Sequence, residues 1–229
     1  MNDLEPAIVD AFRRFGANPA VVTIDLHRGH LDPGVATLPL DVQRAASLLG
    51  RTLPLLDAYR RLGLPVIHLV TSYRNREEIL SNPYWAVQAG RPDGVRRAIA
   101  EHNLEGGPGI ELMPGVQRSG DIVLDTKKRY DCFVDTNLEQ ILRAGGHDSI
   151  LLFGVNTNSC VLATAIAASV RDWAVFVVED GVDSMMGEEY HRAALQILSG
   201  SFGWVIDGEA SLRLLTDRAA PGRTGRTPL

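Results

Sequence analysis

The segment Ile150-Leu151-Leu152-Phe153-Gly154-Val155-Asn156-Thr157-Asn158-Ser159-Cys160-Val161 carries the strongest signal in the chain. Its apolar first half predicts a buried strand that stops at Gly154, and the small polar residues predict a turn into a helix that begins near Asn158. Cys160 would lie in the first helical turn, where free backbone N–H groups favour a thiolate and can hold an oxyanion. The alternative is that this lone cysteine among apolar residues only packs in the core.

The same strand-then-helix pattern repeats along the chain. Strands are expected at residues 20–25, 65–70, 121–125, 149–154, 174–178 and 204–206. Helices are expected at residues 41–62, 136–144, 158–171, 188–199 and 208–215. The segment 72–120 is expected to be irregular, with one helix at about 93–103. This alternation predicts one three-layer α/β/α, Rossmann-like domain with a six-stranded, mainly parallel sheet. The domain is expected to span residues 1–216, followed by a flexible tail at 217–229.

The composition excludes several classes of function. The chain has 229 residues, a formal net charge of −5, and no basic cluster larger than groups such as Lys127-Lys128-Arg129, so we expect no nucleic-acid partner. No apolar run approaches the length of a membrane span, and the acidic N-terminus does not resemble a signal peptide, so we expect no membrane partner. Two cysteines are too few for a disulfide framework, which favours a cytoplasmic location.

Three polar residues follow three of the predicted strands. Asp25 ends the first strand, Lys127 follows the third, and Cys160 follows the fourth. In a parallel sheet these strand ends share one edge, where ligands bind. There Asp25 could take the thiol proton as a general base, and Lys127 could favour both the thiolate and the ionised Asp25. Taken singly, Asp25 could instead cap a loop, and Lys127 could belong to a solvated basic turn.

Three motifs around these residues resemble one protein family. They span residues 22–30, 127–139 and 154–161, and they contain Asp25, Lys127 and Cys160 respectively. Over roughly residues 19–210 the chain resembles the isochorismatase-like family of cysteine hydrolases. The resemblance implies that Asp25 is the catalytic base, Lys127 its partner and Cys160 the nucleophile. It also implies a cis peptide bond between Val155 and Asn156 and an oxyanion hole formed by the N–H groups of Asn156 and Cys160.

The pocket residues are harder to assign. Aromatic and arginine side chains in the irregular segment suit a small polar or carboxylated ligand, although each of them could simply lie on the surface. The predicted substrate-binding residues are His30, Arg74, Trp85, Tyr130, Phe133 and Asn158. His30 could equally bind loop backbone, which is the role favoured for His27.

We predict no metal and no other cofactor. Some members of the family, the nicotinamidases, hold a metal with an Asp-x-His pair and a further histidine, but Thr71-Ser72-Tyr73-Arg74 follows the second strand here. Asp25 and His27 alone do not make a zinc site. His68, inside the second strand, is expected to be a core histidine, and Cys132 to be a packing residue.

The leading hypothesis is cysteine-dependent hydrolysis of a carbon–nitrogen bond in a small linear amide, ureido or carbamoyl compound through a thioester. The partner is then a small-molecule substrate, and the resemblance implies a homodimer or homotetramer. One alternative is vinyl-ether hydrolysis of the isochorismatase type, which needs no thiol and is disfavoured by Cys160. Another is a non-catalytic binding protein on the same fold, disfavoured because all three polar residues are retained.

Overall fold

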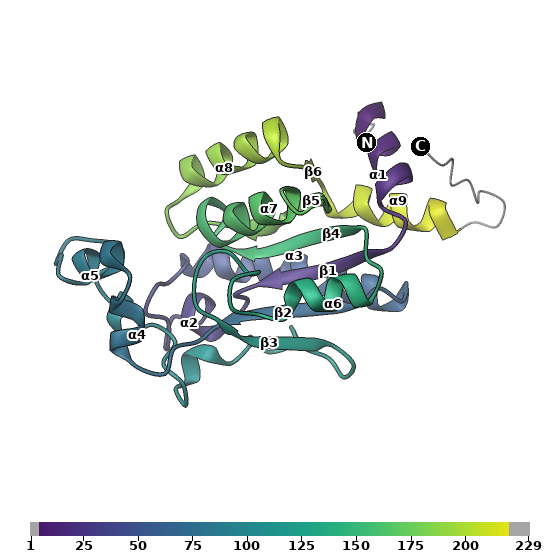
Figure 1. Cartoon of the computed structure of the whole chain (residues 1–229). Coiled ribbons are helices and arrows are strands. Elements are labelled where there is room, and N and C mark those ends of the chain that lie inside the picture. Colours follow the sequence, from purple (N-terminus) through teal and green to yellow (C-terminus); the bar gives the residue numbers. More distant parts are fainter. Residues whose placement is uncertain (1–4, 220–229) are drawn as a thin grey trace.

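Two strands, β1 (Pro19–Ile24) and β4 (Ser149–Val155), are buried at every residue. Helices on both faces leave these strands no solvent-exposed side, which explains why their sequences are apolar without a polar alternation. The computed structural model, which describes residues 5–219, pairs β1 with β4 in the middle of the sheet (Figure 1). The remaining strands are β2 (Val66–Thr71), β3 (Ile122–Lys127), β5 (Ala174–Asp183) and β6 (Trp204–Ile206).

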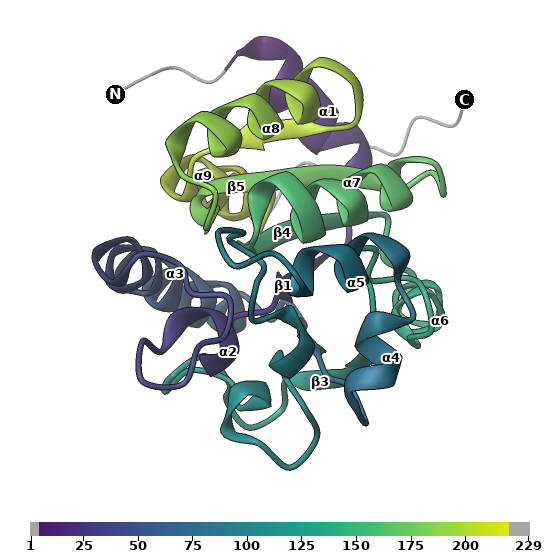
Figure 2. The same cartoon turned by 90° about the vertical axis from the view of Figure 1, so that its left-hand side faces the viewer.

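All neighbouring strands run parallel, in the order β3-β2-β1-β4-β5-β6. This confirms the predicted α/β class and the number of strands. The chain order reverses between β1 and β4, and in open parallel sheets ligands bind at such a reversal, beyond the carboxyl ends of the strands. Figure 2 views the molecule from the side on which α2 (Arg28–Leu31), α4 (Arg76–Leu80) and α5 (Pro83–Ala89) lie.

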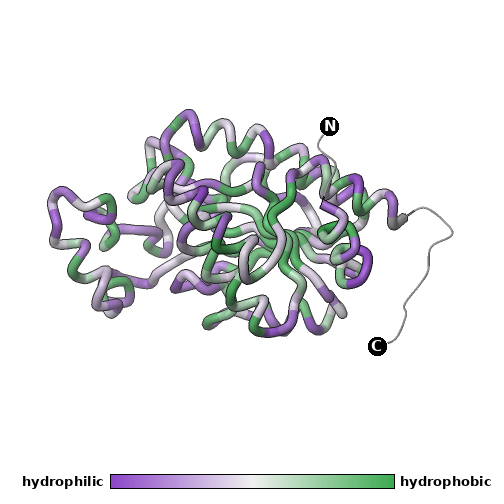
Figure 3. The backbone as a smooth tube through the Cα atoms, turned by 90° about the horizontal axis from the view of Figure 1, so that it is seen from above, coloured by the Kyte–Doolittle hydropathy of each residue, from purple (hydrophilic) through white to green (hydrophobic). Residues whose placement is uncertain are grey.

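Helices cover the two faces of the sheet and enclose two cores. The first core includes side chains of α1 (Pro6–Phe15), α3 (Val42–Arg61) and α9 (Gly208–Ala219). The second includes side chains of α6 (Leu138–Ala144), α7 (Leu162–Ser169) and α8 (Glu188–Ser201). Figure 3 shows the most hydrophobic backbone where the strands converge at the centre.

Successive strand residues point into opposite cores. Val21 and Leu151 belong to the core beneath α3, whereas Val22 and Leu152 belong to the core beneath α7. This alternation is the two-residue period of a pleated strand, and because both cores are apolar it is invisible in the sequence.

The structure departs from the predicted helices at both the N-terminus and the irregular segment. Helix α1 was not predicted, and it buries Phe12 edge-on against Phe176 at a ring distance of 4.9 Å. The predicted helix near 93–103 is wrong, since only a 3-10 turn, Ile99–Glu101, forms there. The segment instead contains α4 and α5, whose short runs are started by Asn75 and Asn82, each accepting a backbone N–H through its side chain.

Three element boundaries also differ from the prediction. A π-helical turn, Thr157–Val161, precedes α7, so the predicted helix at 158–171 begins as a wider turn. Strand β5 continues to Asp183, five residues beyond the predicted end. Helix α9 reaches Ala219 and thus includes the first residues of the predicted tail, while residues 220–229 lie outside the described part of the chain. Among the helices within residues 5–219, none combines the length and apolarity needed to cross a membrane.

The close approach of β1 and β4 depends on Gly154. Its Cα is paired in register with that of Ile24, and its φ of 112° lies in the region that favours glycine. A Cβ at this position would lie 1.9 Å from the carbonyl oxygen of Ile24. A side chain here would therefore push apart the two strands that lead into Asp25 and the cysteine turn.

We expect Gly154→Ala to destabilise the protein by at least about 2 kcal/mol, because the added methyl meets rigid backbone and the φ is unfavourable. The measurement is the free energy of unfolding from urea titrations. Gly50→Ala is the matched control: nothing lies within 4 Å of its added Cβ in α3, and we expect it to stabilise by about 0.5–1 kcal/mol. Equal effects of the two substitutions would contradict the close-approach explanation.

Candidate active site

The three polar residues singled out in the sequence meet at one edge of the sheet. Asp25 directly follows β1, Lys127 is the last residue of β3, and Cys160 lies in the π-helical turn after β4. The Nζ atom of Lys127 is 2.7 Å from Oδ2 of Asp25 and 3.5 Å from Sγ of Cys160. All three side chains are buried. A carboxylate, an ammonium group and a thiol thus share one site that is nearly closed to water.

Thr71, the last residue of β2, completes this cluster. Its backbone N–H and its hydroxyl both donate to Oδ1 of Asp25, at 2.9 and 2.8 Å. Lys127 in turn donates to the Thr71 hydroxyl oxygen at 2.5 Å. Sequence analysis missed Thr71, although its place at the end of the strand between β1 and β3 would have identified it.

The charges in the cluster follow from burial and from the ion pair. Burial by itself raises the pKa of Asp25, but Lys127 and then His27 hold that pKa well below its ordinary value. Burial lowers the pKa of Lys127, but Asp25, together with Cys160 and Cys132, outweighs burial and raises that pKa well above the usual value. Near neutral pH the pair is therefore a carboxylate and an ammonium.

The thiol behaves differently from the sequence-based expectation. Burial raises the pKa of Cys160 to about 11, and the opposing effect of Lys127 is too small to reverse this. The charge of Lys127 is already compensated by Asp25, 2.7 Å away. The resting side chain is therefore a thiol rather than the thiolate that a helix N-terminus would favour.

A cavity opens beside the thiol and contains three of the predicted substrate-binding residues, His30, Trp85 and Tyr130. Its lining also includes both predicted oxyanion-hole residues, Asn156 and Cys160. The other lining residues are Asp25, Leu38, Thr71, Tyr73, Arg96, Ile99, His102, Lys127, Arg129 and Ser159.

The other three predicted substrate-binding residues do not line this cavity. The side chain of Arg74 is 72% exposed and forms an ion pair with Glu78 at 2.9 Å. Phe133 stacks on Trp173 in the core, at a ring distance of 5.5 Å. Asn158 accepts a hydrogen bond from the Ser184 hydroxyl at 2.7 Å.

One wall of the cavity combines aromatic rings with two arginines. The indole of Trp85 donates to the hydroxyl of Tyr130 at 2.8 Å, and the rings of Trp85 and Tyr73 meet edge-on. Arg96 lies over the ring of Tyr130 at 5.7 Å, and Arg129 over that of Trp85 at 4.9 Å. Within residues 5–219, neither arginine has a carboxylate partner. Arg96 and Arg129 come from segments without periodicity, so the sequence could not place them here.

Histidines form another part of the site. Nε2 of His27 lies 3.3 Å from Oδ1 of Asp25 and 2.9 Å from Nδ2 of Asn103, so His27 contacts side chains rather than the loop backbone expected for it. Nδ1 of His30 donates to the carbonyl of Leu38 at 2.7 Å. Burial, followed by the charge of His27, lowers the pKa of His30 to about 3. Burial and the neighbouring histidines also hold the pKa of His102 well below its usual value.

Two other predictions concern residues outside the cavity. His68 is a core histidine, as predicted, and its ring nitrogens lie 2.6 Å from Oγ1 of Thr23 and 3.0 Å from Oδ2 of Asp121. Cys132 is fully buried in the second core, and burial raises its pKa, which agrees with its predicted packing role.

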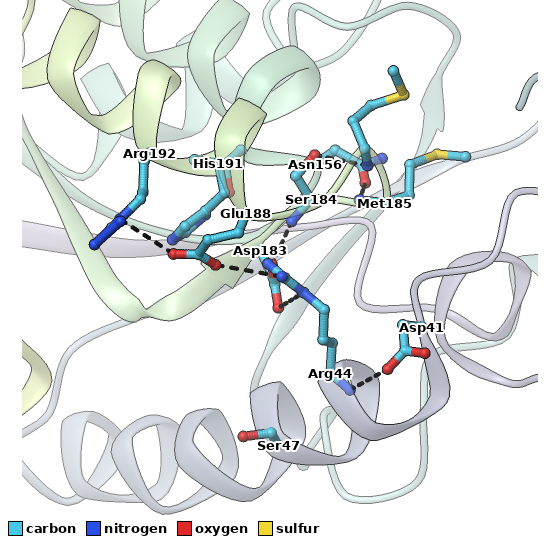
Figure 4. Close-up of polar contacts among 12 residues, drawn as sticks. Asp41, Arg44, Ser47, Asn156, Asp183, Ser184, Met185, Glu188, His191 and Arg192 are labelled. Atoms are coloured by element: carbon cyan, nitrogen blue, oxygen red, sulfur yellow. Dashed lines mark hydrogen bonds and ion pairs between the residues drawn. The ribbon is translucent and has the colours of Figure 1, made fainter.

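The turn that carries Cys160 is tied to the segment after β5. The peptide bond between Val155 and Asn156 is cis, as the family resemblance implies. Oδ1 of Asn156 accepts the backbone N–H of Met185 at 2.8 Å (Figure 4). The hydroxyl of Ser184 donates to Oδ1 of Asn158. Asn156, just before the turn, and Asn158, within it, are thus held by two consecutive residues from another part of the chain.

That supporting segment is in turn fixed by an ion-pair network (Figure 4). The guanidinium of Arg44, on α3, binds both carboxylate oxygens of Asp183 and lies 3.3 Å from Oε2 of Glu188. Asp183 also accepts the backbone N–H of Ser184 at 2.7 Å. Residues from α3, β5 and α8 therefore set the position of the cysteine turn without touching the thiol.

Comparison with known proteins agrees with this geometry. The isochorismatase domain matches residues 19–210. Maleamate amidohydrolase from Pseudomonas putida is 27% identical over 206 residues, covering 88% of each chain. Ureidoacrylate amidohydrolase from Caulobacter segnis is 26% identical over 197 residues, covering 81% of each chain. The crystal structure of N-carbamoylsarcosine amidase from Thermoplasma acidophilum superposes with a TM-score of 0.65 at 28% identity, covering 84% of this chain and 97% of that one. The chain belongs to the isochorismatase family.

Proposed function

We propose that the protein hydrolyses a carbon–nitrogen bond in a small, linear, carboxylated amide or ureido compound through a thioester on Cys160. The observation that supports this most is the position of Lys127, whose Nζ lies within 2.7 Å of Asp25 and 3.5 Å of the Cys160 sulfur at the cavity wall. A base (Asp25), a cation (Lys127) and a nucleophile (Cys160) in contact with one another are the minimum needed to activate a thiol in a site that excludes water.

In the first half of the reaction, Sγ of Cys160 attacks the substrate carbonyl while the Asp25 carboxylate accepts the thiol proton. Lys127 keeps its proton and stabilises the negative charge that moves from Asp25 toward the sulfur. The backbone N–H groups of Asn156 and Cys160 hold the oxyanion of the tetrahedral intermediate. Asp25 then returns the proton to the departing nitrogen, so that ammonia or an amine leaves and a thioester remains.

In the second half, a water molecule enters the position that the leaving group occupied. Asp25 accepts a proton from this water as its oxygen attacks the thioester carbonyl. The carbon–sulfur bond then breaks, the proton returns to the sulfur, and the acid product departs. The thiol and the carboxylate are restored, so the cycle needs no redox partner.

The two arginines support a carboxylated substrate. Arg96 is half-buried over Tyr130 and has no carboxylate partner among the ion pairs of residues 5–219, so its guanidinium can bind an anion. Arg129 is held by the carbonyls of Lys128 and Glu78 and adds positive charge to the same wall. Maleamate and ureidoacrylate, named in the two relatives, are both carboxylates, as this wall would favour.

We expect ammonia release from at least one of maleamate, ureidoacrylate, an N-carbamoyl amino acid, biuret and nicotinamide. Cys160→Ser and Asp25→Asn should each lower kcat/KM at least about 10³-fold, because each removes a group needed for proton transfer or attack. Cys132→Ala removes the other cysteine, which packs in the core, and should retain activity within a few-fold. Turnover that survives in Cys160→Ser would refute the thioester mechanism.

We expect Arg96→Gln to raise KM for a carboxylated substrate such as maleamate by about 10- to 100-fold, the loss of one charge-assisted hydrogen bond. Its effect on kcat should be small, and hydrolysis of the uncharged diamide of the same acid should change little. Arg74→Gln is the control, because Arg74 is exposed and paired with Glu78. If both substitutions affected both substrates equally, Arg96 would not be the carboxylate ligand.

The resting thiol should react slowly near neutral pH. Because burial raises the pKa of Cys160 to about 11, the thiolate fraction and hence the alkylation rate should rise up to about tenfold per pH unit from pH 7 to pH 10. Iodoacetamide labelling of the peptide containing Cys160, followed by mass spectrometry, measures this rate. A rate that is already maximal at pH 7 would mean that the resting residue is a thiolate.

A further inference from the structure

Three histidines that the proposed reaction does not use meet beside the cavity. His27 and His30 flank the start of α2, and His102 follows the 3-10 turn Ile99–Glu101. All three are buried, and one nitrogen from each lies within 4.8 Å of the nitrogens of the other two. The rings of His30 and His102 are 4.7 Å apart, and those of His27 and His30 are stacked at 5.0 Å.

The orientation of each ring is fixed by a contact of one of its ring nitrogens. Nδ1 of His30 bonds the carbonyl of Leu38 at 2.7 Å, and Nδ1 of His102 bonds the hydroxyl of Thr37 at 2.8 Å. Both contacts direct Nε2 away from these partners. Nε2 of His27 lies 3.3 Å from Oδ1 of Asp25 and 2.9 Å from Nδ2 of Asn103, and a metal would select the tautomer that donates from Nε2 to Asp25, because that tautomer leaves the Nδ1 lone pair. Histidines that bind metals almost always have the second nitrogen held in this way.

The spacing suits a small divalent cation. Three atoms 4.8 Å apart lie about 2.8 Å from their common centre, so a shift of under about 1 Å for each ring reaches the zinc–nitrogen distance of about 2.0–2.1 Å. Buried, uncharged imidazoles are ligands for zinc, cobalt and nickel rather than for magnesium or calcium.

The cluster also has an open side. His30 and His102 line the cavity that contains Cys160, whereas the Nδ1 atoms of both rings bond to the loop around Thr37 and Leu38. Three protein ligands and one position open to a cavity are the arrangement of zinc sites that bind water or substrate. The expectation of no metal considered only Asp25 and His27, and the fold adds His30 and His102.

We propose that His27, His30 and His102 form a binding site for a zinc-class divalent cation whose open coordination position faces the cavity. A metal there would bind an oxygen or nitrogen donor of the ligand and orient it within the cavity that Arg96 also lines. This orienting role rests on the proposed hydrolysis, but metal binding itself does not, so the two can fail separately.

Cobalt(II) titration of the chelator-treated full-length protein tests the site without any substrate. We expect one cobalt per chain, with the visible d–d absorption of a tetrahedral site and without the sulfur-to-cobalt charge transfer that Cys160 would cause. Zinc added afterwards should displace the cobalt. His30→Gln and His102→Gln should each weaken binding at least about 100-fold. His147→Gln, at the far end of β4 with its Nδ1 near the Asn18 carbonyl, should bind as the wild type does.

Thr37→Val provides a variant that retains all three ligands. It removes only the hydroxyl behind His102, and we expect it to weaken cobalt binding by about 10-fold. Circular dichroism and thermal midpoints of every variant identify any that fail to fold. Less than a tenth of an equivalent of bound cobalt in the wild type, or equal binding by the wild type and the folded histidine variants, would overturn the proposal. Cobalt binding without detectable amide hydrolysis would support the site and reject only its role in the proposed function.

Discussion

The buried ion pair between Asp25 and Lys127 is the interaction on which the rest of this site depends. Two full charges lie where the sheet edge excludes water, and each would be strongly unfavourable alone. Breaking such a pair typically costs about 3–5 kcal/mol, because it leaves an uncompensated buried charge. Thr71 satisfies both partners through its hydroxyl, so β1, β2 and β3 are joined at their ends by one polar cluster.

The same ion pair explains the protonation state of Cys160, the proposed nucleophile. Because Asp25 compensates the charge of Lys127, little of that charge is left to stabilise a thiolate, and burial keeps Cys160 protonated. In the mechanism that we propose, activation therefore requires the proton to move to Asp25 as the carbonyl is attacked. A site of this kind keeps its sulfur unreactive until a substrate is bound, which suits a cysteine exposed to a solvent-accessible cavity.

The groups around the cavity divide it into two chemically different parts. Arg96 and Arg129, stacked over aromatic rings, supply positive charge without a carboxylate partner within residues 5–219. His30 and His102 supply neutral nitrogen donors from the other part. An elongated substrate with one anionic end and one polar end would place its central carbonyl near Cys160, which is the geometry that both proposals share.

The sequence by itself determined the kind of sheet and the polar residues at its edge. Apolar runs ending in Asp25, Lys127 and the cysteine turn predict a parallel sheet and a shared edge. These features are local, because strand burial and turn chemistry are written in consecutive residues. The cis bond before Asn156 was likewise predicted by resemblance to a family motif and is found.

Only the tertiary structure decided which other residues reach the site. Arg96 and His102 lie far from Cys160 in the chain, and they reach its cavity through loop paths that no periodicity encodes. The side chain of Arg74 instead forms an ion pair with Glu78, although its residue type and its place in the irregular segment suited a pocket residue equally well. The pKa of Cys160 was also beyond the sequence, since it depends on the burial of the turn and on the charge that Asp25 removes from Lys127. Local sequence specifies elements and their ends, whereas desolvation and side-chain convergence arise only when distant segments pack together.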